Sequence, residues 1–267
     1  MAPKVVILCG GLGTRLREET EYRPKPMVEI GGKPVLWHVM KLFAHHGMTE
    51  FVLCAGYRGQ MIKDYFLNYE ARNSDLTITL GDHASVRFHG THLETGWEVT
   101  VADTGELTQT GGRVKRVEHY LDGDTFVVTY GDGLADVDLT ALLAHHRAHG
   151  KLATVTTTRP LSRFGIVDLE TDATVARFRE KPQADDWVSS GFFVFQREFL
   201  AELDSDCILE REPLERLAAA GELVAYQHDG FWQPMDTYRE FQMLSEMWQT
   251  GKAPWAVWED DERVPRS

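Results

Sequence analysis

The segment K-V-V-I-L-C at residues 4–9, with the glycine-rich turn that follows it at residues 10–16, constrains the fold most. A run of apolar, mostly β-branched residues has no polar face, so it is expected in a parallel sheet covered on both sides. Ligands of such sheets bind beyond the carboxyl ends of the strands. Glycines let the backbone approach a phosphate and point successive N–H groups at it. The segment predicts a buried strand ending in a phosphate-binding loop, and a turn without a ligand is the alternative.

The next hundred residues alternate between strand and helix patterns. Apolar residues recur on one helical face within residues 34–47, and a strand at 51–55 and a helix at about 59–69 follow. This order predicts an α/β fold with a doubly wound, mostly parallel sheet. Further strands are expected at 76–80, 86–88, 98–102, 125–130, 153–158, 166–169, 175–179, 191–195 and 223–227, with helices at about 138–149 and 237–249.

The chain is predicted to form a single domain, residues 1–258, followed by a charged tail at 259–267. Within the domain we expect a nucleotide-binding core at about 1–133. A β-rich, substrate-binding half is expected at about 134–258. Apolar residues make up 43% of the 267 residues, which is enough for a buried core.

Charge, hydropathy and cysteine content exclude several classes of function. The chain carries 41 acidic and 28 basic residues, a net charge of −13, which disfavours nucleic-acid binding. The apolar run at 5–9 is too short for a membrane span or a signal peptide, so we expect no membrane association and a cytoplasmic location. Three cysteines, Cys9, Cys54 and Cys207, do not suggest a disulfide scaffold, and buried thiols are the preferred interpretation.

The loop after the first strand matches neither the dinucleotide-binding fingerprint nor the Walker phosphate-binding loop. A dinucleotide fingerprint needs a third glycine where Leu16 stands, and no G-K-S/T triplet occurs anywhere in the chain. Hydride transfer with a nicotinamide cofactor is therefore disfavoured. Thr14 and Arg15 add a hydroxyl group and a permanent charge to the loop, which favours a small polyphosphate ligand.

Three more charged residues lie in constrained surroundings. Prolines on both sides hold Lys25 in an extended segment, although such a segment is also an ordinary surface loop. Asp132 follows a buried strand between two glycines and suits a magnesium ion, with a turn aspartate as the alternative. Asp236 is a second candidate carboxylate, and it is equally a candidate N-cap of the last helix, two roles that are compatible.

Two further patterns carry weaker signals. Lys181 precedes a proline and is a candidate for binding a second phosphate, and Gly191 would let a sugar lie against its strand. His145 and His149 have the i, i+4 spacing of some metal ligands. Because polar side chains also favour helix C-termini, a structural role is preferred for these histidines.

Taken together, these motifs resemble the sugar-1-phosphate nucleotidyltransferase family, most closely its glucose-1-phosphate cytidylyltransferases. The likeness covers nearly the whole chain. The matching blocks are G-G-L-G-T-R-L at 10–16, P-K-P-M-V-E-I-G-G-K-P at 24–34, L-W-H-V-M at 36–40, G-Y-R-G at 56–59, V-A-D-T-G at 101–105, T-G-G-R-V-K-R-V at 110–117, Y-G-D-G-L-A-D at 130–136, R-F-G at 163–165, G-F-W-Q-P-M-D-T at 230–237 and G-K-A-P-W at 251–255.

The resemblance implies a Rossmann-like nucleotidyltransferase fold whose second half binds the sugar. It also implies a magnesium-dependent enzyme that transfers the cytidylyl group of CTP to a sugar 1-phosphate, expected to be α-D-glucose 1-phosphate, with release of pyrophosphate. Catalytic roles fall on Arg15, Lys25 and Asp132, and Asp132 and Asp236 would share the magnesium ion. The implied nucleotide-binding residues are Leu8, Gly10, Gly11, Gly13, Thr14, Arg15, Lys25, Thr104, Thr110, Gly111, Arg113 and Gly131. The implied sugar-phosphate residues are Gly165, Lys181, Ser190 and Gly191.

The chain departs from the family pattern at one position. Members read N-G-G-F-F before the sugar-side strand, with an asparagine that bonds sugar hydroxyls, where this chain reads S-S-G-F-F at 189–193; we interpret Ser190 as the departure from that asparagine. Serine offers a single hydroxyl group, so the identity of the sugar is the open point. The alternatives are another sugar 1-phosphate, another nucleotide (UTP, dTTP or GTP), or a non-catalytic nucleotide-sensing subunit. A homo-oligomer is expected by resemblance only.

Overall fold

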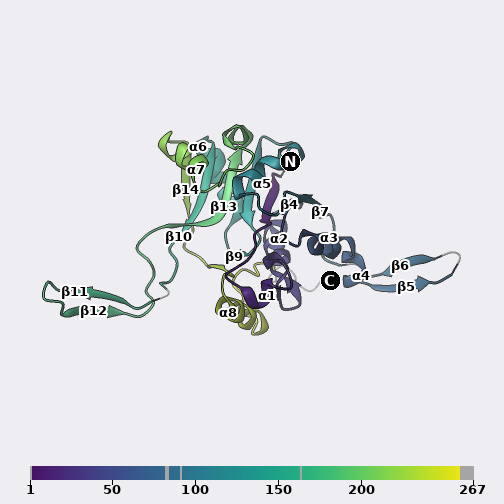
Figure 1. The fold of residues 1–267 in the computed structure, drawn as a ribbon, viewed down its shortest axis with the longest axis horizontal. Coiled ribbons are helices and arrows are strands. Elements are labelled where there is room, and N and C mark those ends of the chain that lie inside the picture. The colour runs from purple at the N-terminus through teal and green to yellow at the C-terminus, as the bar shows by residue number, and fades with distance from the viewer. Residues whose placement is uncertain (1, 82–83, 91, 163, 259–267) are drawn as a thin grey trace, which may run out of the picture.

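One seven-stranded sheet forms the centre of the molecule (Figure 1). The computed structural model describes residues 2–81, 84–90, 92–162 and 164–258, so the predicted tail at 259–267 and Arg163 of the R-F-G block lie outside the described residues. In spatial order the strands are β14 (Leu223–Gln227), β10 (Ala153–Thr158), β13 (Val188–Gln196), β8 (Thr125–Tyr130), β1 (Lys4–Cys9), β4 (Glu50–Ala55) and β7 (Glu98–Asp103).

Neighbouring strands of this sheet are parallel except around β13, which runs antiparallel to both β8 and β10. The predicted α/β fold with a mostly parallel sheet is therefore confirmed. The sheet takes strands from both sides of residue 133, so the two predicted halves share one scaffold. The division into a nucleotide-binding core and a sugar-binding half stays a prediction.

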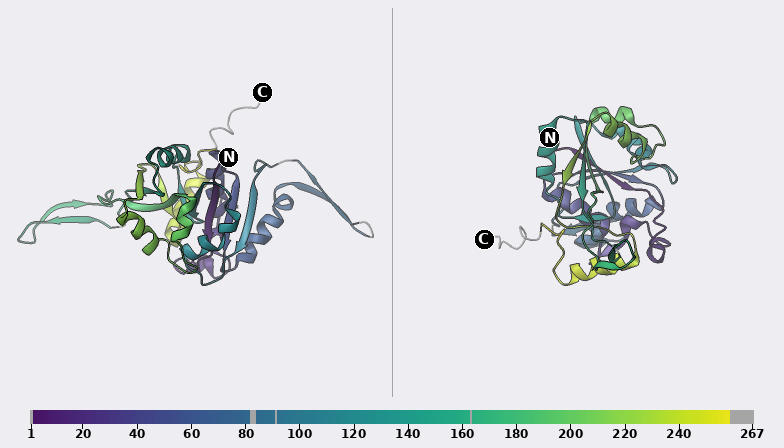
Figure 2. Two further views of the ribbon diagram at one scale, coloured as in Figure 1. Left: turned by 90° about the horizontal axis from the view of Figure 1, so that it is seen from above. Right: turned by 90° about the vertical axis from the view of Figure 1, so that its left-hand side faces the viewer.

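Helices lie on both sides of the sheet (Figure 2), as the uniformly apolar first strand predicts. Val5, Ile7 and Cys9 belong to one buried cluster, while Val6 and Leu8 belong to the other. The first cluster includes residues of α2, α3, α6 and α8, and the second includes residues of α5 and α7. The helices are α1 (Arg17–Thr20), α2 (Val35–His45), α3 (Gly59–Leu67), α4 (Tyr69–Asn73), α5 (Thr110–Arg116), α6 (Leu139–His149), α7 (Glu212–Ala219) and α8 (Tyr238–Gln249), with 3-10 turns at Lys25–Met27, Glu118–Tyr120 and Arg197–Glu202.

Four two-stranded ribbons stand apart from the main sheet. They are β2 (Glu29–Ile30) with β3 (Lys33–Pro34), β5 (Asp75–Thr79) with β6 (Ser85–His89), β9 (Gly133–Ala135) with β15 (Trp232–Pro234), and β11 (Ile166–Leu169) with β12 (Val175–Arg179). The β5–β6 and β11–β12 ribbons project from opposite sides of the molecule (Figure 1). Among the described helices, none combines the length and apolar character needed to cross a bilayer.

Two pairings bring distant segments to one edge of the sheet. Leu8 of β1 pairs with Tyr130 of β8, so the loops after these strands begin side by side. In the β9–β15 ribbon Gly133 pairs with Pro234, and the N–H of Met235 donates to the carbonyl of Asp132. The loop after β1, the turn after β8 and the segment before α8 therefore meet beyond the carboxyl ends of β1 and β8.

Candidate active site

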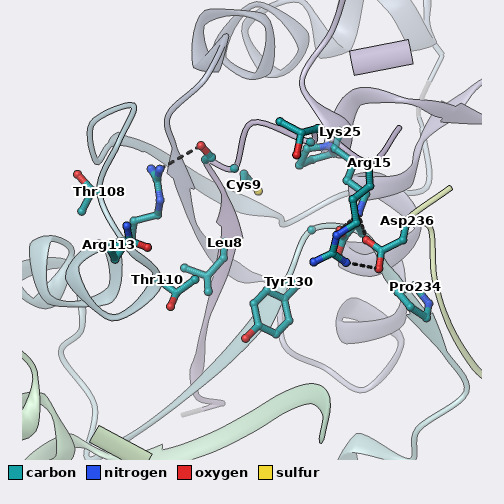
Figure 3. A pocket seen from close by; sticks show the side chains of 18 of the residues that line it. Leu8, Cys9, Arg15, Lys25, Thr108, Thr110, Arg113, Tyr130, Pro234 and Asp236 are labelled. Atoms are coloured by element: carbon teal, nitrogen blue, oxygen red, sulfur yellow. Dashed lines mark hydrogen bonds and ion pairs between the residues drawn. The ribbon is translucent and has the colours of Figure 1, made fainter. Parts of the chain in front are cut away.

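A cavity of about 540 Å³ lies where these three segments meet (Figure 3). Its volume is in the range of small-molecule sites. It lies beyond the carboxyl ends of parallel strands, where ligands of open α/β sheets bind. The predicted site residues that line it are Leu8, Gly10, Gly11, Gly13, Thr14, Arg15, Lys25, Thr110, Arg113, Gly131, Asp132 and Asp236.

Two glycines of the loop after β1 are required by its conformation. Gly13 has a φ of +64°, a left-handed conformation that other residues adopt only with strain. Its carbonyl accepts hydrogen bonds from the N–H of Leu16 and the hydroxyl of Thr20. At Gly10 a Cβ would lie 2.0 Å from a guanidinium nitrogen of Arg113, so a side chain there would displace the guanidinium from its backbone partners. The loop is thus shaped by a tight turn and by a close neighbour.

Four charged side chains form one cluster in the cavity. The ammonium group of Lys25 lies 2.5 Å from an oxygen of Asp132 and 2.6 Å from an oxygen of Asp236. Arg15 donates to the other oxygen of Asp236 at 2.7 Å (Figure 3). The side chain of Lys25 is 11% exposed and that of Arg15 is 75% exposed. Lys25 therefore bridges the two carboxylates, while Arg15, the more exposed cation, contacts Asp236 alone.

The cluster shifts the pKa of two of its members. Burial alone would lower the pKa of Lys25, but the charges and hydrogen bonds of Asp132 and Asp236 outweigh burial and raise it. Burial alone would raise the pKa of Asp236, but Lys25 and Arg15 outweigh burial and lower it. Both groups are therefore held in their charged forms at neutral pH.

The proposed cap role of Asp236 is wrong, because the N-cap of α8 is the next residue, Thr237. The side chain of Thr237 accepts the N–H of Glu240, and the carboxylate of Glu240 accepts the N–H of Thr237, which completes a capping box. The same carboxylate accepts the N–H of Asp236. This arrangement leaves the Asp236 side chain pointing into the charged cluster.

Arg113 binds the backbone around the cavity. Its buried guanidinium donates to the carbonyls of Gly10, Gly105 and Glu106 and to the hydroxyl of Thr104. Thr104 is fully buried, is not a lining residue, and donates in turn to the carbonyl of Ala55. Arg113 therefore holds the glycine loop against the segment after β7.

We expect Arg113→Lys to lower the free energy of unfolding by about 2 kcal/mol, because one ammonium group leaves some of these buried carbonyls without a donor. Urea denaturation measures this change. The matched control is Arg116→Lys, because exposed Arg116 makes a single such bond, to the carbonyl of Thr104, which a lysine can replace. Equal stability losses in the two variants would contradict the role assigned to Arg113.

Besides Thr104, five other predicted site residues do not line the cavity. Gly111 packs against another segment, since a Cβ there would lie 2.5 Å from the sulfur of Cys207. Gly165 directly precedes β11 and Lys181 follows β12 by two residues, so both lie at the base of the β11–β12 ribbon. Ser190 is 4% exposed, and its hydroxyl donates to the carbonyl of Thr156 within the sheet. Gly191, on β13, packs against the ring of Tyr130.

The cavity also has lining residues that sequence reasoning did not assign. They are Cys9, Pro26, Thr108, Gln109, Tyr130, Trp232 and Pro234. Thr108 and Gln109 directly precede the T-G-G-R block, and Trp232 and Pro234 precede Asp236 within one block, so proximity to those blocks was the available signal. Burial raises the pKa of Cys9 well above its usual value, so this thiol stays protonated and structural.

The histidines of α6 serve the packing of that helix. His146 and His149 both hydrogen-bond the hydroxyl of Thr154 on the adjacent strand β10. Within the described residues, no group of three or more His, Cys, Asp and Glu side chains is placed to hold a metal ion. The structural interpretation of these histidines is therefore the one that their contacts support.

The chain is similar to several known proteins over most of its length. A sequence model of a family described as nucleotidyl transferase matches residues 4–232. The chain is 49% identical over 259 residues to the glucose-1-phosphate cytidylyltransferase of Salmonella typhi, covering 96% of this chain and 100% of the relative. It is 42% identical over 257 residues to the probable glucose-1-phosphate cytidylyltransferase of Bacillus subtilis (strain 168), covering 96% and 100%. Among solved structures, HddC from Yersinia pseudotuberculosis matches with a TM-score of 0.69 over 92% of this chain and 100% of that chain; at 22% identity this likeness concerns the fold alone.

Proposed function

Because the chain belongs to the nucleotidyl transferase family, we propose that it transfers the cytidylyl group of CTP to a sugar 1-phosphate, with release of pyrophosphate. The carrying observation is the 49% identity to a glucose-1-phosphate cytidylyltransferase along nearly the full length of both chains. The same relatives make α-D-glucose 1-phosphate the expected acceptor. The product is then CDP-glucose.

The charges in the cavity suit this reaction. An oxygen of the sugar phosphate attacks the α-phosphorus of CTP, and the bond from that phosphorus to pyrophosphate breaks. Because the attacking oxygen is already anionic, no general base is needed. The residues have to hold two negatively charged reactants in line and stabilise the charge that develops between them. Lys25 and Arg15 supply fixed positive charge for this task, and the glycine loop supplies backbone N–H groups.

The proposal includes a magnesium ion held by Asp132 and Asp236. A cation fits between these carboxylates, because the ammonium group of Lys25 already contacts one oxygen of each. Two protein carboxylates with remaining ligands from substrate and water are typical of magnesium sites. When bound, the ion would neutralise charge on the reacting phosphates. With its carboxylate partners holding the ion, the ammonium group of Lys25 would be available to phosphate.

Recognition of the sugar is the finer part of the proposal. The hydroxyl of Ser190 donates to the carbonyl of Thr156 within the sheet. Aligned on Phe192 and Phe193, the N-G-G-F-F pattern places its asparagine at Ser189, which is exposed, so the assignment of the departure to Ser190 is wrong by one residue. The indole N–H of Trp232, which lines the cavity, donates to the carbonyl of Ser190 at 2.8 Å. Gly165 and Lys181 remain candidates for the sugar phosphate, from the base of the β11–β12 ribbon.

A substrate panel tests the function directly. Pyrophosphate release is measured for CTP, UTP, dTTP and GTP, each crossed with several sugar 1-phosphates. The proposal expects the highest kcat/KM for CTP with α-D-glucose 1-phosphate. A higher kcat/KM for another nucleotide or another sugar 1-phosphate would show that the protein carries out the same type of reaction on different substrates. Magnesium-dependent nucleotide binding without product from any pair would favour a regulatory protein instead.

We also propose that the protein is a homo-oligomer, in which the projecting ribbons contact a second copy. Each ribbon carries exposed apolar side chains, among them Ile78 and Val86 on β5–β6 and Leu169 and Phe178 on β11–β12. Surfaces of this kind are typical of protein interfaces. Sedimentation velocity should give a mass that is a multiple of 30.3 kDa, and Ile78→Asp should reduce it. A wild-type protein that sediments as a single 30.3 kDa species would contradict the proposal.

A cytoplasmic location is part of the same proposal. The three cysteines are free thiols, and Cys9 and Cys54 are buried. Free thiols fit a reducing compartment.

A further inference from the structure

Glu210 joins two walls of the cavity without lining it. Its carboxylate accepts a hydrogen bond from the hydroxyl of Tyr130 on one oxygen and from the hydroxyl of Thr110 on the other, the latter at 2.6 Å. Tyr130 ends β8 and Thr110 begins α5, and both line the cavity. Hydrogen bonds to an ionised acceptor are shorter and stronger than those between neutral groups. One carboxylate therefore holds side chains from two different elements.

The segment at residues 205–210 is docked closely on the beginning of α5. The N–H of Leu209 donates to the Thr110 hydroxyl at 2.9 Å, and the N–H of Gly112 donates to the carbonyl of Cys207 at 3.1 Å. Gly111 and Gly112 permit this approach, since a Cβ at either position would lie 2.5 Å from an atom of the segment. These contacts place the Glu210 carboxylate between Thr110 and Tyr130.

Tyr130 stands between the cavity and the strand of the predicted sugar-binding half. A Cβ at Gly191 of β13 would lie 2.4 Å from the Tyr130 ring, so this glycine lets the ring lie against the strand. Gly131 and Asp132 of the charged cluster directly follow Tyr130. The position of the Tyr130 ring therefore affects both the shape of the cavity and the surface on which the second substrate is expected.

We propose that Glu210 is a positioning residue for the transfer reaction: it fixes the Tyr130 ring between the two substrates and secures Thr110 at the nucleotide end. The inference rests on the proposed function. Glu210 is itself exposed, so its hydrogen bonds add little to the stability of the fold. Its effect falls on the alignment of the reactants, where small displacements lower the rate strongly.

A double-mutant cycle of Glu210→Ala and Tyr130→Phe tests this inference, with the nucleotide and sugar 1-phosphate that the wild-type protein uses best. Each single variant should lower kcat by about tenfold, the size expected when the reactants are held in a slightly displaced position. The double variant should be no slower than Glu210→Ala, because both changes remove the Tyr130–Glu210 hydrogen bond and Glu210→Ala already includes the loss of the Thr110 hydrogen bond. Glu210→Gln, whose amide oxygen still accepts the tyrosine hydroxyl, should recover part of kcat. The matched control is Glu215→Ala, an exposed glutamate on α7 that should leave kcat unchanged.

The possible outcomes separate the two proposals. Losses that multiply in the double variant would show that Glu210 acts independently of Tyr130, which overturns the positioning role. If the Glu210 variants unfold at lower urea concentrations and this instability accounts for their loss of activity, Glu210 only stabilises the fold. This result would also overturn the positioning role. A wild-type protein without turnover on any substrate pair overturns the proposed function itself.

Discussion

Replacing Lys25 with alanine is expected to lower kcat by about a hundred- to a thousandfold while the protein stays folded, as for loss of a group that stabilises transition-state charge. Lys25 is the least exposed cation of the charged cluster and contacts both Asp132 and Asp236. Without it, the cluster loses the less exposed of its two cations, which the proposed function assigns to the reacting phosphates. Initial rates at saturating CTP and sugar phosphate measure the effect.

The matched control for this variant is Lys151→Ala. Lys151 pairs with Glu222 at 2.9 Å, so its replacement also removes an ion pair between a lysine and a carboxylate. Neither of these two residues lines the cavity. Its kcat should equal that of the wild-type protein, and a urea titration should show that both variants remain folded. Near-normal turnover in Lys25→Ala would refute the catalytic role of this lysine.

Asp132→Asn is expected to lower kcat by about a thousandfold, because the amide keeps the size of the side chain but removes half of the carboxylate charge that would hold magnesium. Binding of Mn²⁺ in the absence of nucleotide, followed by electron paramagnetic resonance, gives a second readout. The variant should bind Mn²⁺ more weakly than the wild-type protein. The control is Asp122→Asn, an exposed aspartate paired with Lys4 at 3.1 Å.

The two active-site variants should differ in Mn²⁺ affinity, and only Asp132→Asn should bind the ion more weakly than the wild-type protein. Lys25→Ala keeps both carboxylates and removes the ammonium group that occupies them, so it should bind Mn²⁺ at least as tightly as the wild-type protein. If Asp132→Asn leaves Mn²⁺ binding unchanged, the magnesium site between Asp132 and Asp236 is wrong. This result would leave the charge role of Lys25 standing, since that role is tested by kcat.

Local patterns predicted most of the elements of this fold. The strand at Lys4–Cys9 could be predicted because its apolar residues leave no polar face, and the structure divides them between two buried clusters. The ribbons β5–β6 and β11–β12 were also expected as strands. Their departure from the main sheet could not be predicted, because alternating patterns describe a strand and not its partner.

The role of Asp236 could not be assigned from the local sequence. An aspartate and a threonine adjoin at 236–237, and both residue types cap helices well, so the sequence leaves the cap ambiguous. The backbone places Thr237 at the cap and turns Asp236 toward Lys25, which lies 211 residues earlier in the chain. Arg113 is a similar case, because the local sequence does not show whether an arginine binds backbone carbonyl groups or phosphate.

By itself, the sequence determined the class of the fold, the glycine loop with Arg15 and Lys25, and the family resemblance, because each depends on residues that are close in the chain. The tertiary structure alone decided which distant groups meet: Asp132 with Asp236 across Lys25, and Thr110 with Tyr130 across Glu210. The physical reason is the register of β1 with β8 and of β9 with β15, which brings these segments to one edge of the sheet. Packing of apolar side chains on the faces of the sheet sets that register, and no single segment of the chain encodes it.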